Sequence, residues 1–191
     1  MRTHIPSALS MKDYVHYILD TYIDYKRDNI ILGKVFGKDA YLSYAEDFFD
    51  YVKFQDVTLF NALGVALGIS YKNPVKTWLN ISDSQIESGI YYEFLQNITK
   101  DHNLLVTVDY NRLKLRSQIK VNLDALVKLA PSIIVDGHKP FQVLQLPIVV
   151  YCKTIKGKGV LEIERDPMKY HYVIEDERLY EKAIVQLYPR K

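Results

Sequence analysis

In the first half of the chain, hydrophobic residues recur every three or four positions. Val15, Ile18, Leu19, Tyr22 and Ile23 share one face of a helix at this spacing. Similar stretches, opened by capping residues or by a proline, predict four more helices. The expected helices cover residues 10–29, 43–52, 58–67, 74–79 and 82–100.

From Leu104 onward the hydrophobic residues form short runs separated by turn residues, which is typical of strands. Asn122 and Asp176 each suit the N-cap of a further helix. Because the turns between the runs are short, the pattern favours an antiparallel meander. The expected strands cover residues 104–109, 112–121, 133–135, 141–146, 148–155, 160–165 and 170–174.

Runs of helices followed by runs of strands indicate an α+β fold rather than an alternating α/β fold. We therefore expect an N-terminal helical part, residues 1–103, followed by a mostly antiparallel sheet with flanking helices, residues 104–191. A chain of 191 residues is short enough for both parts to share one continuous core.

Residues 112–121 alternate cationic or polar residues with mostly apolar ones, which predicts a strand with one basic face. A loop of two lysines and two glycines, residues 156–159, adds positive charge and lacks the spacing of a phosphate-binding loop. The candidate binding residues are Arg112, Lys114, Arg116, Lys120, Lys156 and Lys158.

Charge is distributed unevenly along the chain, although the formal net charge is only +2. Residues 1–103 carry 10 Lys and Arg against 13 Asp and Glu, whereas residues 104–191 carry 15 against 10. The second half therefore has an excess of five positive charges. This excess suits an acidic protein surface or nucleic acid, and it is modest beside that of strongly basic DNA-binding domains.

Cys152 is the only cysteine of the chain, so no intramolecular disulfide can form. A reducing compartment is the natural interpretation. No apolar run reaches the ~18 residues that a membrane span requires, so we expect a cytoplasmic protein without a membrane partner.

Sequence motifs for catalysis are absent from the chain. The five histidines are scattered, without the short spacings of zinc sites, and no nucleophile elbow occurs. We therefore expect no catalytic residue, no metal and no cofactor.

The main functional hypothesis is a non-catalytic assembly or interaction protein that works in a multi-chain complex. Sixteen tyrosines favour protein interfaces, because a tyrosine ring buries area while its hydroxyl stays satisfied. A bacteriophage or other viral component, structural or involved in host interaction, fits this pattern. Its partner would be another protein or a second copy of the chain.

A winged-helix DNA-binding protein is the alternative hypothesis. Three helices, residues 58–68, 74–79 and 82–100, would precede a wing hairpin, residues 104–121, whose cations touch phosphates. Glu87 and Glu93 on the recognition helix count against DNA.

A magnesium-dependent nuclease is a more distant hypothesis. It would use Asp136, Glu162 and Glu164 on adjacent strands to hold the metal ion. The usual Glu-x-Lys pair is missing, because Arg165 follows Glu164.

Overall fold

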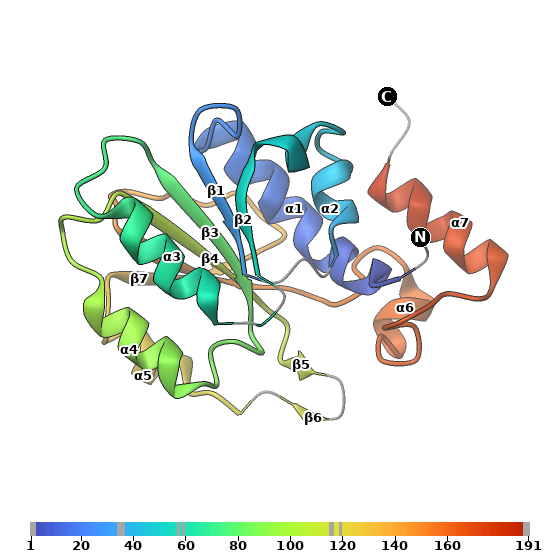
Figure 1. Cartoon of the computed structure of the whole chain (residues 1–191). Coiled ribbons are helices and arrows are strands. Elements are labelled where there is room, and N and C mark those ends of the chain that lie inside the picture. Colours follow the sequence, from blue (N-terminus) through green and yellow to red (C-terminus); the bar gives the residue numbers. More distant parts are fainter. Residues whose placement is uncertain are drawn as a thin grey trace.

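A parallel β-sheet lies at the centre of the molecule (Figure 1). The computed structural model describes residues 3–33, 37–56, 58, 60–114, 117–118 and 120–188. Over these residues the sheet has six strands in the order β2-β1-β3-β4-β8-β7, and every neighbouring pair is parallel. The strands are β1 (Asn29–Leu32), β2 (Val52–Gln55), β3 (Thr77–Ser82), β4 (Leu104–Tyr110), β7 (Ser132–Asp136) and β8 (Ile148–Lys153).

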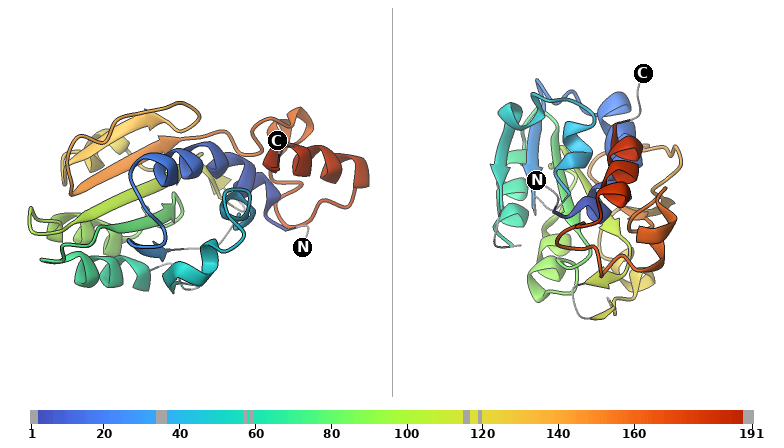
Figure 2. Two further views of the ribbon diagram at one scale, coloured as in Figure 1. Left: turned by 90° about the horizontal axis from the view of Figure 1, so that it is seen from above. Right: turned by 90° about the vertical axis from the view of Figure 1, so that its right-hand side faces the viewer.

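Helices cover both faces of the sheet, which gives the molecule three layers (Figure 2). The first face packs against α1 (Ile5–Thr21) and α2 (Asp39–Leu42), and α7 (Glu177–Leu187) contacts α1. The helices of the second face are α3 (Asn61–Ser70), α4 (Gly89–Asn97) and α5 (Leu123–Leu126). Two further elements are the 3-10 turn η1 (Phe48–Tyr51) and the helix α6 (Leu161–Arg165).

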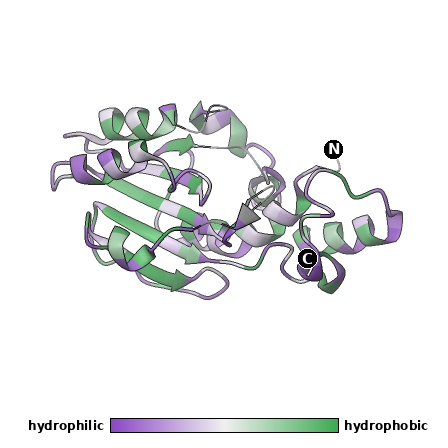
Figure 3. Ribbon diagram, turned by 90° about the horizontal axis from the view of Figure 1, so that it is seen from below, coloured by the Kyte–Doolittle hydropathy of each residue, from purple (hydrophilic) through white to green (hydrophobic). Residues whose placement is uncertain are grey.

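Burial on both faces explains the hydrophobic pattern of the central strands. All seven residues of β4 are buried. Leu105 belongs to the hydrophobic cluster beneath α1, and Val106 belongs to the cluster beneath α3 and α4. A strand buried on both faces carries a nearly continuous apolar run, and Figure 3 shows the sheet as mainly hydrophobic.

The expected α+β fold with a mostly antiparallel sheet is wrong. The sheet is entirely parallel over the described residues, and β7 and β8, which the meander would pair antiparallel, run in the same direction. Helices α3, α4 and α5 each connect two strands of the sheet, so helices and strands alternate along the chain. This alternation defines an α/β fold of the Rossmann-like type.

Several expected elements are confirmed, and others are wrong. Asp176 caps α7 by accepting the N–H of Leu179 at 3.0 Å, and β4 and β8 are strands. The expected helix over residues 74–79 gives way to the strand β3, and the expected strand over 160–165 is the helix α6. The expected strands over residues 141–146 and 170–174, all of which are described, contain no strand residue, and the expected helix over residues 43–52 is a run of turns followed by η1 and the start of β2.

The expected basic strand, residues 112–121, is also wrong. Its described residues form a small antiparallel hairpin in which β5 (Leu113–Lys114) pairs with β6 (Ser117–Gln118), separate from the main sheet. Residues 115, 116 and 119 lie outside the described part of the chain.

Buried polar side chains attach α1 to the central strands. Tyr14 of α1 donates its hydroxyl to the amide oxygen of Asn80 on β3 at 3.0 Å. Thr107 of β4 donates to the same oxygen at 2.8 Å, and Trp78 donates to Thr107 at 2.9 Å. These bonds fix α1 across the strands whose carboxyl ends carry the candidate site.

No helix among the described residues is both long and apolar enough to cross a membrane.

Candidate functional site

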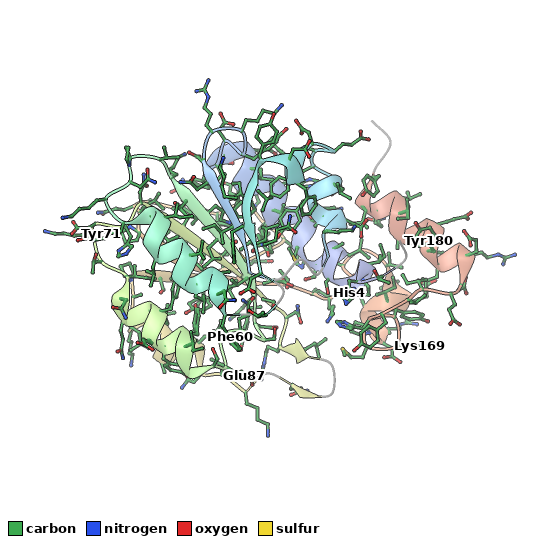
Figure 4. The ribbon with its side chains drawn as sticks, viewed as in Figure 1. His4, Phe60, Tyr71, Glu87, Lys169 and Tyr180 are labelled. Carbon is green, nitrogen blue, oxygen red and sulfur yellow. The ribbon has the colours of Figure 1, made fainter. Side chains whose placement is uncertain are left out.

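Two buried carboxylates meet where the central strands β3 and β4 end. Asp83 follows β3 directly, and its backbone N–H donates to the carbonyl of Asp109, near the end of β4, at 3.0 Å. Both residues are only 3% exposed. Figure 4 places Phe60, Glu87 and His4 around this end of the sheet and Tyr71 at the opposite end. In open parallel sheets, ligands bind at the carboxyl ends of the strands.

Asp109 has donors on both of its carboxylate oxygens. The hydroxyl of Ser10, from α1, lies 2.9 Å from Oδ1 and 2.8 Å from Oδ2. The hydroxyl of Thr154 donates to Oδ1 at 2.5 Å, and the amide of Asn111 donates to Oδ2 at 3.1 Å. Burial raises the pKa of Asp109, although these donors and the charge of Lys156 oppose the shift.

Asp83 uses only one of its carboxylate oxygens for hydrogen bonds within the described residues. Its Oδ2 accepts the backbone N–H groups of Asn111 at 3.0 Å and of Arg112 at 2.7 Å. Burial and the nearby charge of Asp109 raise the pKa of Asp83 to about 7. A carboxyl group with a perturbed pKa and an oxygen left over is typical of a functional site.

Lys156 faces both carboxylates from the loop that follows β8. The residue is 5% exposed, and within the described part of the chain its ammonium makes neither a hydrogen bond nor an ion pair within 4.0 Å. Burial lowers the pKa of Lys156, while the charges of Asp109 and Asp83 oppose that shift.

Gly157 holds this lysine in place. Its backbone has a φ of 85°, which favours glycine, and its N–H donates to the carbonyl of Pro6 at 2.9 Å. The loop after β8 is thereby fastened to the beginning of α1.

The loops after β1 and β3 pack closely beside the carboxylates. A Cβ atom on Gly33 would lie 2.6 Å from Cγ2 of Ile81 and 2.7 Å from the side-chain nitrogen of Gln85, so a larger residue would force these side chains to shift. The side chain of Gln85 accepts the N–H of Ser82 at 3.0 Å. This contact shapes a turn between β3 and α4, although the sequence pattern predicts a helix start at Ser82.

The structure separates the candidate binding residues. Arg112 is exposed beside Asp83, and Lys156 is buried beside it. Lys158 is half-buried two residues further along, and the exposed Lys120 donates its backbone N–H to Glu87 at 2.9 Å. Lys114 belongs to β5, but its side chain is not described. Arg116 lies outside the described residues.

Sequence reasoning missed the two acids at the centre of the site. Asp83 and Asp109 each stand at the end of a buried apolar run, and that position is the available signal. The signal becomes meaningful only when the runs are parallel, because parallel strands bring their carboxyl ends to one edge.

The winged-helix interpretation is wrong. Its first wing strand is β4, which lies inside the sheet between β3 and β8. A strand buried between two neighbours cannot lie against DNA phosphates.

The nuclease interpretation is also wrong. Glu162 and Glu164 lie on the helix α6 instead of on a strand beside Asp136. No three residues of the His, Cys, Asp and Glu types come together as a metal-binding group in the described ranges.

Comparison with known proteins gives a structural match without a sequence match. No protein-family model matches the chain, and no curated protein matches it either. The fold resembles that of a transketolase from Campylobacter jejuni subsp. jejuni NCTC 11168, with a TM-score of 0.62 and 16% sequence identity. The match covers 96% of this chain and 37% of that transketolase.

This match corrects the hypothesis of a non-catalytic assembly protein of viral origin. The chain has the fold of part of a metabolic enzyme, and nothing in the comparison points to a virus or a bacteriophage. At this level of identity the likeness establishes the fold alone, and the chain spans about a third of the length of the transketolase.

Proposed function

We propose that the chain is a ligand-binding unit of a metabolic enzyme and that it binds a phosphorylated ligand together with Mg²⁺. The ligand lies at the carboxyl ends of β3 and β4. The observation that carries this proposal is Lys156, a residue only 5% exposed, whose ammonium interacts with the charges of Asp83 and Asp109 without a hydrogen bond or ion pair to any described residue.

The combination of charges favours a metal ion bridged to phosphate. Two carboxylates and one lysine leave a net negative charge when all three are ionised, which suits a cation. Mg²⁺ is commonly bound by one or two carboxylates together with phosphate oxygens and water, instead of by a complete cage of protein ligands. Lysine is in turn a common partner of phosphate.

Asp83 provides the oxygen that suits Mg²⁺. Within the described residues Oδ1 of Asp83 has no hydrogen-bond donor, so it can bind the ion without losing a protein contact. Asp109, which already accepts from Ser10, Thr154 and Asn111, instead holds the surrounding loops in place. In this proposal Asp83 is the metal ligand and Asp109 positions the site.

The cytoplasm is the compartment that we propose for this protein. Cys152 is fully buried as a free thiol within β8, and a phosphorylated metabolite with Mg²⁺ is available there.

Isothermal titration calorimetry tests the proposal. The probes are MgCl₂ with inorganic pyrophosphate, and MgCl₂ with thiamine diphosphate, which carries a diphosphate on an aromatic body. We expect binding that requires both Mg²⁺ and the diphosphate. Lys156→Met and Asp83→Asn should each weaken it by roughly ten-fold or more, since each removes a charged partner from a buried site.

Lys100→Gln is the matched control, because this exposed lysine precedes β4 at the opposite end of the sheet. It removes the same charge as Lys156→Met and should leave the affinity unchanged. Equal binding by all three variants, or wild-type protein that binds neither probe at millimolar concentration, would refute the proposal.

A further inference from the structure

A groove of about 490 Å³ opens beside the ends of β4 and β8, next to the two carboxylates. Arg112, Asp124, Lys153 and Thr154 are among the residues on its wall. Thr154 also donates its hydroxyl to Asp109 at 2.5 Å, so the groove and the carboxylate site share a residue. A ligand at the carboxylates can therefore extend into this groove, whose volume is within the range of small-molecule sites.

The two cations of the groove are not neutralised by the described part of the protein. Arg112 and Lys153 are both exposed, and neither forms an ion pair within 4.0 Å of a carboxylate there. Asp136, which is the register partner of Lys153 on β7, is instead paired with Lys139 at 3.1 Å. With Asp124 as the acid on its wall, the groove keeps an excess of positive charge.

The backbone of Arg112 is held beside Asp83 in an unusual conformation. Its φ of 65° lies in the left-handed region, which few residues other than glycine adopt. The N–H of Arg112 compensates for this conformation by donating to Asp83 at 2.7 Å. Strained residues cluster at functional sites, and here the strained backbone places Arg112 next to the carboxylate site.

We propose that Arg112 and Lys153 bind a second phosphate group in this groove. A guanidinium offers two parallel N–H donors that match two oxygens of a phosphate, and the lysine adds a further charge. The inference rests on the proposed function in one respect, namely that the same ligand carries its first phosphorylated end near Lys156. The ligand is then a small molecule with anionic groups at both ends.

Inorganic phosphate without Mg²⁺ is the probe for the groove, and calorimetry measures its affinity. The first variant is Arg112→Asn, because asparagine tolerates a positive φ and keeps the N–H that donates to Asp83. The second is Lys153→Gln. We expect each to weaken phosphate binding by roughly three- to ten-fold, and the double variant to abolish it.

The location of binding is read from backbone amide shifts in ¹⁵N spectra. We expect phosphate to move the signals of Asn122 and Asp124, which line the groove, and to leave that of Asp101 unchanged. Lys100→Gln serves again as the charge-matched control. Acetate at the same concentration should bind more weakly, because it presents fewer oxygens.

The two proposals fail in different ways. Lys153→Gln should weaken the binding of phosphate alone more than the binding of Mg²⁺ with pyrophosphate, and Lys156→Met should do the reverse. Loss of the Mg²⁺ complex in the wild type with phosphate binding intact would refute the proposed function only. Phosphate binding that persists in the Arg112→Asn, Lys153→Gln double variant, or that is absent from the wild type, would refute the proposed phosphate site in the groove.

Discussion

The two ends of the sheet treat buried charge differently. At the amino end, Asp28 and Lys76 precede β1 and β3, and their side chains form an ion pair at 3.5 Å. The lysine also donates to the carbonyl of Tyr22, and the acid accepts the N–H of Asp24 at 3.1 Å. At the carboxyl end, Asp83 and Lys156 are near each other without an ion pair within 4.0 Å over the described residues.

We call the amino end of the sheet closed, because its buried acid has a direct ionic partner. We call the carboxyl end open, because its acids and lysine form no direct ion pair within the described residues. A charge that is buried beside its partner stabilises the fold or at least costs it little, whereas a buried charge without a direct partner costs free energy. Proteins accept such a cost mainly where a ligand repays it. The amino end therefore contributes to stability, and the carboxyl end retains charged groups that a ligand can satisfy.

The largest expected effect is the pH dependence of stability that Asp83 causes. Its pKa is about 7 in the folded protein, against 3.8 for an ordinary aspartate. Because the folded-state pKa is raised, the protonated acid favours folding, and its contribution is complete below pH ~4. The free energy of unfolding should then fall by up to about 4 kcal/mol as the pH rises from ~4 to ~7.

Urea unfolding at a series of pH values measures this loss. Asp83→Asn should remove most of the slope between pH ~4 and ~7, because the amide does not titrate. Asp101→Asn replaces an exposed acid near the amino end of β4 and should keep the wild-type slope. If the free energy of unfolding of the wild type does not change between pH ~4 and ~7, Asp83 is not a buried acid with a raised pKa, and the carboxyl end does not differ from the amino end in this respect.

The second largest effect is expected for Asp109→Ala. The substitution removes the carboxylate that accepts from the buried hydroxyl of Ser10, the half-buried hydroxyl of Thr154 and the half-buried amide of Asn111. We expect a loss of about 3 kcal/mol in the free energy of unfolding, since each orphaned buried donor is costly. Urea denaturation at pH 5 measures it, where the Asp83 contribution is still largely present.

Asp109→Asn is the matching conservative change. It keeps an acceptor oxygen and removes the charge that raises the pKa of Asp83. The variant should therefore lose less stability than Asp109→Ala and should shift the pH dependence of unfolding to lower pH. Equal losses for both variants would mean that the hydrogen bonds of Asp109 contribute little.

The strand β4 and the helix α7 could be predicted from the sequence because their signals are local. The start of α7 depends on Asp176, and β4 is a continuous apolar run. The strand β3 could not be predicted, because Pro74 and the pair of Ser82 and Gln85 imitate helix starts. The hydrogen bond between Ser82 and Gln85 does form, but it shapes a turn.

The candidate site could be predicted only in part, because its geometry depends on strand register. The sequence pattern already indicates Arg112 and Lys156 as candidate binding residues. Their acidic partners meet only because β3 and β4 are parallel, with Ser82 opposite Asp109 in the register. The sequence pattern predicts a helix where β3 lies, so it does not bring Asp83 and Asp109 together.

A smaller effect is expected when the ion pair at the amino end is broken. Lys76→Met removes the partner of Asp28, whose side chain is 10% exposed, while the lysine side chain is 42% exposed. We expect a loss of about 1 kcal/mol in the free energy of unfolding, because the pair is only partly shielded from solvent. The loss should shrink at 1 M salt, which screens the pair. An unchanged free energy of unfolding would mean that the ion pair of Asp28 and Lys76 does not stabilise the fold, so the two ends would not differ in stability.

The smallest effect on stability is expected for Lys156→Met, although Lys156 is the more buried of the two lysines. The methionine avoids the cost of burying an ammonium, which is the same cost that lowers the pKa of Lys156. The carboxylates Asp83 and Asp109 lose a favourable charge in exchange, so the two contributions oppose each other. We expect a change within about 0.5 kcal/mol in urea denaturation at pH 7, together with the loss of diphosphate binding. A loss as large as that of Lys76→Met would instead make Lys156 a structural residue, and both ends of the sheet would then be closed.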